Sequence, residues 1–346
     1  MKTYHFIVNP TASSGKGAAV WQRMEALLKK ENITYEVHVP ESGEAVTALV
    51  HKLTGQKRPY TGEDTVDAYM EAAAALEEYA GEGNHAHMCR KDRDEVHLVV
   101  VGGDGTLNKV LQGIEDFEHT VISCISTGSG NDFARNMHIS GDAEQSLWQL
   151  LHAPEETIID YGIATYRQAD GSEIVRRFLI SSGVGYDADI CEEVGRSRLK
   201  PILNRIRLGR LVYVAIGIKQ IFTRTVTRVI ITMDEKKPMK LNGLFFVVGM
   251  IHQMEGGGVP FCPHADAADG MLDICLVRDM PKWKLLLAVM LVYRKKHLLF
   301  RRITEHRCRK ISIRTERPQW FHIDGDTSCQ VRELVLECKS GLRFVG

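Results

Sequence analysis

Three glycine-bearing loops carry the carboxylate, amide and hydroxyl groups of this sequence that are best placed for chemistry. The strongest is Gly102-Gly103-Asp104-Gly105-Thr106, which follows an apolar run and precedes an amphipathic helical pattern. Paired glycines let the backbone approach a ligand closely, and the amides at a helix start attract phosphate. Because a bare aspartate would repel phosphate, Asp104 predicts a metal ion or an ordered water beside it. The alternative is an ordinary glycine turn with a capping aspartate.

The other two loops also follow apolar runs. Residues 126–137 (STGSGNDFARNM) combine small residues with polar Asn131 and Asp132. Residues 9–17 (NPTASSGKG) offer hydroxyls, amides and one lysine, but they are not a Walker A loop, because Pro10 stands where that motif has glycine. In an open parallel sheet, ligands bind at the carboxyl ends of the strands. Together the three loops predict a phosphate site.

Two further motifs lie in the second half of the chain. Residues 255–260 (EGGGVP) and 267–273 (AADGMLD) are rich in glycine and aspartate, although a simple turn explains the second equally well. The segment from His322 to Asp326 (HIDGD) places two carboxylates around a glycine. A carboxylate on such a turn could accept the proton of a hydroxyl nucleophile.

The first third of the chain alternates strand and helix patterns, with strands expected at 4–9, 35–39, 96–101 and 121–126 and helices at 17–30 and 44–53. Continuous apolar strands in this order predict an α/β domain with a parallel sheet covered by helices. The polar segment 56–95 is interpreted as a surface insertion.

After Pro154 the pattern becomes mainly β, and an antiparallel β domain with helical segments at 199–222 and 281–300 is expected. Its strands are expected at 157–165, 175–181, 226–234, 243–251, 271–277, 310–315 and 331–337. We therefore divide the chain into an α/β domain at 1–154, a β domain at 155–330 and a C-terminal segment at 331–346. Packing of that last segment back onto the first domain is left open.

The composition narrows the class of protein. Hydrophobic residues make up 44% of the 346, enough for two cores, and the eight cysteines contain no C-x-x-C pair, so a reducing compartment is expected. The start of the chain lacks a secretory pattern, and the longest apolar run, 285–293, is far shorter than the roughly 20 residues of a spanning helix. We expect a cytoplasmic protein.

Positive charge is concentrated in two segments although the net charge is zero. Residues 196–224 contain eight lysines and arginines between Arg196 and Arg224 and no acid, and residues 282–310 contain ten against Glu305 alone. This segregation indicates an anionic partner. No interleaved aromatic platform accompanies the charges, so nucleic acid is not expected as the partner.

The combination of GGDGT, GSGNDFAR and NPTASSGKG resembles the diacylglycerol kinase catalytic-domain family, which includes bacterial lipid kinases and the sphingosine kinases. The resemblance continues through residues 159–162 (IDYG), 183–188 (GVGYDA), the GGG and DGMLDI stretches and the final DGD. It spans nearly the whole chain apart from 56–95.

The resemblance implies an α/β nucleotide-binding domain followed by an antiparallel β-sandwich, with an ATP- and Mg2+-dependent active site between them. The implied ATP contacts are Asn9, Pro10, Thr11, Gly102, Gly103, Asp104, Gly105, Thr106, Gly128, Ser129 and Asn131. A metal–water network is implied for Asp104, Asp132 and Asp160, and a structural magnesium for Asp269 with the carbonyls of Ala267 and Met271. Asp104 and Asp326 are the implied catalytic residues, with Asp326 at the position of the general base.

The sequence departs from the family pattern at two positions. DGD replaces the usual DGE, so the carboxylate of Asp326 is one methylene shorter, and Lys109 stands where an acid is common. The expected activity is phosphorylation of diacylglycerol or a similar lipid alcohol. A sphingoid-base or other lipid kinase and a weakly catalytic nucleotide or lipid sensor are the alternatives, whereas the GSGNDFAR loop argues against a soluble-substrate kinase.

A lipid kinase must reach its substrate in the bilayer. Residues 199–222 mix apolar residues with arginines, as in an interfacial amphipathic helix, and basic residues favour anionic lipid by about 1 kcal/mol each. We expect peripheral association with the inner face of the membrane; a core-facing helix with a solvated basic face is the alternative. A homodimer is compatible with the sequence, and His85, His87 and Cys89 are interpreted as incidental rather than zinc ligands.

Overall fold

The computed structural model describes residues 3–10, 12, 17–55, 95–128, 130–168, 170–197 and 209–346. Nearly all of the expected insertion at 56–95 lies outside the described residues, as do Thr11, Ser129 and the first part of the helix expected at 199–222.

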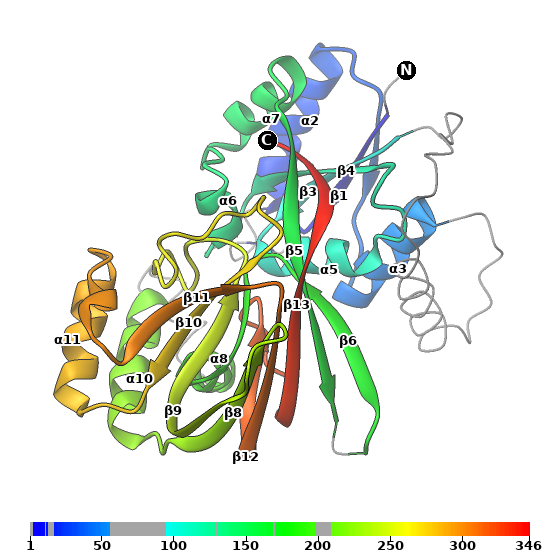
Figure 1. Cartoon of the computed structure of the whole chain (residues 1–346). Helices are drawn as coiled ribbons and strands as arrows, with labels where there is room; N and C mark the ends of the chain where they lie inside the picture. The colour runs from blue at the N-terminus through cyan, green and yellow to red at the C-terminus, as the bar shows by residue number, and fades with distance from the viewer. Residues whose placement is uncertain are drawn as a thin grey trace.

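The N-terminal half contains four strands that pair in parallel in the order β4-β3-β1-β2. They are β1 (Tyr4–Val8), β2 (Tyr35–His38), β3 (Val96–Gly102) and β4 (Thr120–Ser126). The helices of this half are α2 (Gly17–Lys30), α3 (Gly43–Thr54), α5 (Asp104–Gly113), α6 (Asp132–Asn136) and α7 (Ala143–His152). Figure 1 shows α2 and α7 on one side of these strands and α3 and α5 on the other, and a separate apolar cluster fills each side.

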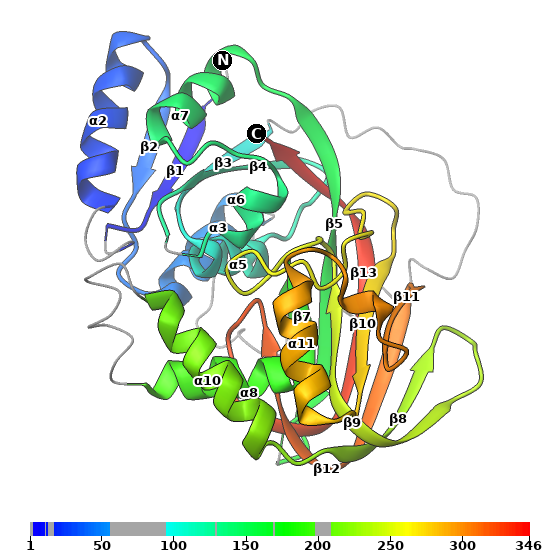
Figure 2. The same ribbon diagram turned by 90° about the vertical axis from the view of Figure 1, so that its left-hand side faces the viewer.

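The C-terminal half is built from antiparallel strands. These are β5 (Glu156–Arg167), β6 (Glu173–Phe178), β7 (Ser181–Gly185), β8 (Thr227–Met233), β9 (Met239–Met250), β10 (Leu272–Arg278), β11 (Ile303–Cys308), β12 (Lys310–Ile323) and β13 (Gln330–Val345). Its helices are α8 (Tyr186–Arg196), α10 (Gly209–Thr223), α11 (Lys282–Val292) and the short 3-10 helix His297–Leu299. Figure 2 shows α8, α10 and α11 together on one side of this half.

Strand β13 joins the two halves. It pairs antiparallel with β5 over most of its length and then in parallel with β4, where Arg343 lies opposite Val121. All strands therefore belong to one mixed 13-stranded sheet rather than to two separate ones. Figure 1 shows β5 and β13 running through both halves.

Several expected elements differ in detail. The single strand expected at 175–181 is two strands, β6 and β7, and the segment between them turns to meet the 324–326 turn described below. Four elements were not expected: α6, α7, α8 and β11. β11 alternates exposed and buried positions only weakly, which hides its strand pattern.

Gly162 in β5 makes the junction between the halves tight. It lies opposite Phe178 of β6, and a Cβ at Gly162 would stand 1.9 Å from Cζ of that ring. Because Phe178 is fully buried, the ring has no space into which it could move.

We expect Gly162→Ala to destabilise the protein by about 1–3 kcal/mol through overpacking, measured by urea denaturation. Gly141→Ala is the control, because Gly141 is exposed and a Cβ there meets nothing within 4 Å. Equal midpoints of urea unfolding for Gly162→Ala and Gly141→Ala would contradict this explanation.

Candidate active site at the junction of the two halves

The three glycine-bearing loops meet at the carboxyl ends of β1, β3 and β4. Asn9 Nδ2 donates to Thr106 Oγ1 at 3.0 Å, and the Thr127 amide donates to the Gly102 carbonyl at 2.9 Å. Gly103 and Gly128 lie back to back, since a Cβ on Gly128 would stand 2.7 Å from the Gly103 Cα. The backbone contact explains why both positions are glycine.

Asp104 stands at the centre of this junction. Its Oδ2 accepts the Asp132 amide at 3.0 Å and its Oδ1 the Phe133 amide at 3.2 Å, so the carboxylate covers the start of α6. Burial, followed by the charge of Asp132, raises the pKa of Asp104 to about 6. A cation beside this carboxylate would reverse that shift. Gly105 opens onto free space, because a Cβ there would meet nothing within 4 Å.

The side-chain oxygens at Asp104 and Asn131 are suitable ligands for a hard cation. The Oδ1 of Asn131 is buried without a hydrogen-bond partner among the described residues. Mg2+ prefers oxygen ligands and binds through one or two carboxylates. Asp104 and Asn131 therefore fit a magnesium ion, with Asp132 adjacent.

Asp132 connects α6 to the glycine loop at 254–258. Its carboxylate accepts the Gly257 amide at 2.8 Å and lies 3.7 Å from Arg135. Asn136 adds two hydrogen bonds to the backbone of Met254, at 2.8 and 3.0 Å. The GGG stretch of the β half therefore belongs to this site.

The segment 322–326 reaches the site from β12 through a tight turn. Asp324 and Gly325 adopt left-handed conformations, with φ of 47° and 81°. The Asp324 carboxylate accepts four hydrogen bonds of 2.7–3.1 Å, from Asn108 Nδ2 and the amides of residues 179–181. Asn108 lies one helical turn beyond Asp104 on α5, so the Asp324 carboxylate attaches the 322–326 turn to the N-terminal half.

Asp326 is the accessible carboxylate of the pair. Its side chain is 59% exposed and lies 3.2 Å from the guanidinium of Arg176 on β6. Asp324 has its oxygens engaged in hydrogen bonds, so Asp326 alone of the two could meet a substrate.

Asp160 does not join Asp104 and Asp132 in the contacts of the described residues. Its amide donates to the Ala267 carbonyl at 2.6 Å, and its carboxylate accepts the Gly270 amide at 2.7 Å. Burial raises the pKa of Asp160. The structure groups Asp160 with the 267–271 loop, and the metal–water network expected to link it to Asp104 and Asp132 stays a prediction.

The 267–271 loop contains an aspartate that pairs with an arginine side chain. Asp269 accepts the Met271 amide at 3.0 Å through Oδ1, while its Oδ2 lies 3.1 Å from Arg307, which also contacts the buried Asp273 at 3.3 Å. The Ala267 carbonyl accepts the Asp160 amide. In this arrangement Arg307 supplies the positive charge beside Asp269, and the structural magnesium expected at Asp269, Ala267 and Met271 stays a prediction.

Three buried side chains, Asp187, Glu255 and His322, meet under the 322–326 turn, and this cluster was not predicted from the sequence. His322 Nε2 lies 3.0 Å from Asp187, the Gly325 amide lies 3.3 Å from His322 Nδ1, and Ser181 Oγ donates to Glu255. Burial opposes protonation of His322, but Asp187 outweighs it and raises the pKa of His322, while burial raises the pKa of Glu255 to about 7. Asp187, Glu255 and His322 each stand in a motif quoted from the sequence, yet nothing in their spacing predicts that they meet.

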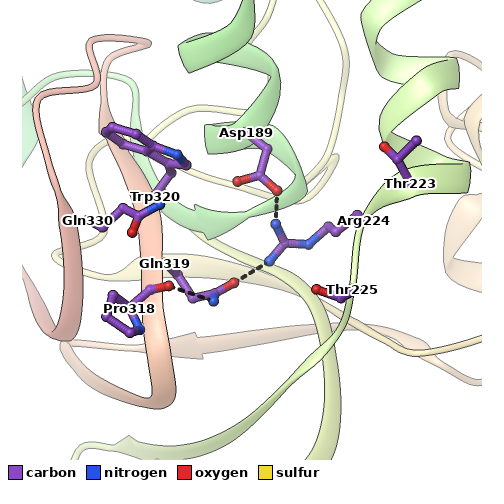
Figure 3. A pocket seen from close by; sticks show the side chains of 8 residues that line it. All are labelled: Asp189, Thr223, Arg224, Thr225, Pro318, Gln319, Trp320 and Gln330. Atoms are coloured by element: carbon purple, nitrogen blue, oxygen red, sulfur yellow. Dashed lines mark hydrogen bonds and ion pairs between the residues drawn. The ribbon is translucent and has the colours of Figure 1, made fainter.

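A polar cavity of about 250 Å3 lies away from these loops, between α8, the end of α10 and β12. Figure 3 shows Arg224 between Asp189 and Gln319. The guanidinium also donates to the Phe245 carbonyl at 2.9 Å, and burial lowers its pKa to about 10. Its donors are used within the protein, so we assign this arginine a structural role.

Comparison with known proteins agrees with this architecture. The family profile "Diacylglycerol kinase catalytic domain" matches residues 3–162, and "YegS C-terminal NAD kinase beta sandwich-like domain" matches residues 180–341. The two matches together cover most of the chain and divide it near the junction described above.

Relatives and solved structures match over nearly the full length. A Bacillus subtilis protein provisionally named lipid kinase YtlR is 24% identical, with 94% of each chain covered. The Staphylococcus carnosus diacylglycerol kinase is 23% identical over 98% of this chain and 93% of its own. The structure of a Bacillus anthracis protein provisionally named a diacylglycerol kinase superposes with a TM-score of 0.67 at 16% identity, covering 99% of this chain and 96% of the other.

The raised pKa of Asp104 predicts how metal-free stability depends on pH. The ordinary value of 3.8 rises to about 6 in the fold. The contribution of Asp104 to stability is therefore complete below about pH 4 and is lost as the pH rises through 6. We expect the stability of Asp104→Asn relative to wild type to increase by roughly 2–3 kcal/mol between pH 4 and 8, measured by urea denaturation in EDTA.

Asp170→Asn is the matched control. Hydrogen bonds from Ser172 lower the pKa of Asp170, so its relative stability should change in the opposite direction. A pH-independent difference for Asp104→Asn would show that the buried carboxylate is not the source.

Proposed function

Because this chain belongs to the diacylglycerol kinase catalytic-domain family of lipid kinases, we propose that it transfers the γ-phosphoryl group of Mg-ATP to the hydroxyl of diacylglycerol, giving phosphatidic acid. The observation that carries the proposal is the meeting of three glycine-bearing loops with the 324–326 turn through the Asn108–Asp324 hydrogen bond of 2.7 Å. This contact supports a phosphate site at the loops with the accessible carboxylate of Asp326 next to it.

The nucleotide is proposed to bind at the loops of the α/β half. Backbone amides at the start of α5 and the Asn9–Thr106 pair would hold the phosphates. A magnesium ion held by Asp104 and Asn131, when bound, would neutralise charge on the transferred group. The contacts implied for Thr11 and Ser129 stay predictions, since both lie outside the described residues.

The proposed base is Asp326. The lipid oxygen attacks the γ-phosphorus, the bond to the ADP oxygen breaks, and the hydroxyl proton passes to the Asp326 carboxylate. The Arg176 guanidinium lies 3.2 Å from that carboxylate and must move away as the proton arrives. The rigid Asp324 anchor sets the position of the turn, which limits how far the shorter side chain can reach.

Membrane docking is proposed at a surface formed by α10 and α11, which contact each other. Its exposed apolar residues include Val214, Ile218 and Phe222 on α10, Trp283 and Met290 on α11, and Tyr293 just after α11. Lysines and arginines lie in the first turn of α11, at 282 and 284, and directly after the helix, at 294–296. Apolar side chains beside basic ones suit an anionic bilayer surface. No described helix is both long and apolar enough to cross a membrane.

We expect Asp326→Asn to lower kcat by about 100-fold or more while ATP binding, measured by calorimetry, stays within a factor of two or so. The assay uses radiolabelled ATP and mixed micelles of diacylglycerol, monoacylglycerol, sphingosine or undecaprenol. Asp326→Glu, which restores the lost methylene, is the control and should remain active. Unchanged turnover in the Asn variant would exclude Asp326 as the base, and preference for sphingosine would favour the sphingoid-base alternative.

Replacing both Trp283 and Met290 by alanine should weaken sedimentation with anionic vesicles several-fold, because these side chains are 63% and 73% exposed. Trp148→Ala is the matched control, since this tryptophan is 60% exposed on α7, in the other half. Equal vesicle binding by all three proteins, or binding insensitive to salt, would contradict the docking surface.

A further inference from the structure

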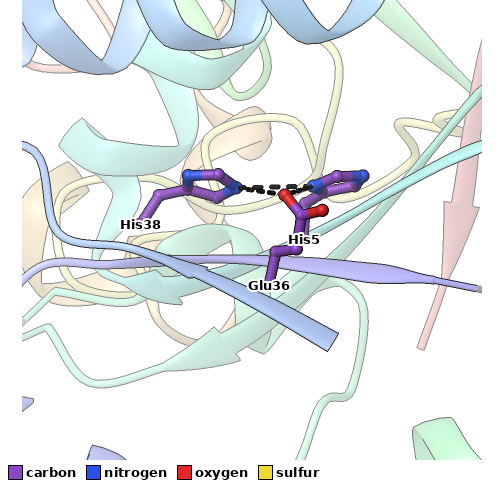
Figure 4. Close-up of side chains that lie close together, drawn as sticks. All are labelled: His5, Glu36 and His38. Carbon is purple, nitrogen blue, oxygen red and sulfur yellow. Dashed lines mark hydrogen bonds and ion pairs between the residues drawn. The ribbon is translucent and has the colours of Figure 1, made fainter. Parts of the chain in front are cut away.

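Two histidines and a glutamate converge on the edge of the parallel strands. His5 of β1 lies opposite Glu36 of β2, and His38 follows two residues later on β2, so all three project from one face. Figure 4 shows the two rings pointing their nitrogens at each other with the Glu36 carboxylate beside them. None of these residues takes part in the proposed kinase mechanism.

The atoms that could bind a metal are already close together. His5 Nδ1 lies 3.3 Å from His38 Nε2 and 3.4 Å from Glu36 Oε2, and the His38–Glu36 distance is 3.8 Å. Ligands about 2.1 Å from a tetrahedral zinc ion are separated from each other by roughly 3.4 Å. The three distances therefore match the edges of a tetrahedral site.

The two rings need only a small rotation to accept an ion. Their planes differ by 21° and their centroids are 5.6 Å apart, and the facing nitrogens lie within hydrogen-bond distance. A divalent ion would replace this contact once both lone pairs turn toward a common point. The side chains of His5 and His38 are 16% and 20% exposed and that of Glu36 is 59% exposed, which leaves the site shielded but reachable.

The ligand types favour one class of metal ion. Each imidazole can offer one ring nitrogen to a metal. Nitrogen ligands together with one carboxylate suit zinc-class ions rather than magnesium, which separates this site from the oxygen donors around Asp104.

We infer that His5, Glu36 and His38 form a binding site for a divalent transition-metal ion of the zinc class, with water as the fourth ligand. The ion joins β1 to β2, a four-residue edge strand held by pairing on one side only. Binding to the folded state alone would then stabilise the nucleotide-binding half.

The test is titration of the full-length chain with Zn2+ in chelator-treated buffer without nucleotide, followed by calorimetry and thermal denaturation. We expect His38→Ala and Glu36→Gln each to weaken one zinc equivalent at least about 10-fold and to remove the associated rise in Tm. Co2+ in place of Zn2+ should give the intense visible absorption of a tetrahedral complex in the wild type but not in His38→Ala.

Two controls separate this site from others. His51→Ala removes a half-exposed histidine of α3 that is paired with Glu115 at 2.6 Å but has no second histidine beside it, so zinc binding should not change. Replacing His85, His87 and Cys89 together should also leave this equivalent in place. Equal zinc affinity in wild type and His38→Ala, or loss of all binding in the triple variant, would overturn the inference. Circular dichroism and ATP binding confirm that each variant is folded.

Discussion

The buried carboxylate of Asp324 is the constraint on which the rest of the site depends. A charge removed from water must be met by hydrogen bonds or an opposite charge, and Asp324 satisfies this requirement with donors from both halves of the chain. Burial still raises its pKa. Three features therefore depend on one another: the turn, the break between β6 and β7, and Asn108 on α5. Loss of any one of them leaves the buried carboxylate without part of its hydrogen bonds.

The same requirement recurs where Asp132 meets the 254–258 loop. That carboxylate faces the amide of Gly257, and Asn136 satisfies both backbone groups of Met254. With β13 shared by the two halves, the junction combines a continuous sheet with two sets of polar cross-links. The glycine-bearing loops and the 324–326 turn are thus held by backbone hydrogen bonds, which tolerate little displacement.

Sequence reasoning succeeded where function resides in local motifs. Each glycine-bearing loop directly follows an apolar strand, so their meeting at one sheet edge follows from the α/β order alone. The family resemblance and the lipid kinase class were likewise predicted and are confirmed by the comparisons. The substrate and the individual site residues stay predictions.

Sequence reasoning failed where contacts join segments that lie far apart in the chain. Asp187 and His322 each stand in a motif, but they are 135 residues apart and no spacing rule pairs them. Arg307 likewise occupies Asp269 from another strand. α8 offered a readable signal that was overlooked, because Tyr186, Ile190 and Val194 recur every four residues after the left-handed Gly185.

Two arginines give this chain its own electrostatic arrangement. Arg176 pairs with Asp326, where the family resemblance places the base, and Arg307 pairs with Asp269, where it places a structural metal ligand. A guanidinium cannot lose its proton in a protein, so each carboxylate has a fixed positive charge beside it. A ligand that approaches the Asp326 carboxylate therefore meets the Arg176 guanidinium as well.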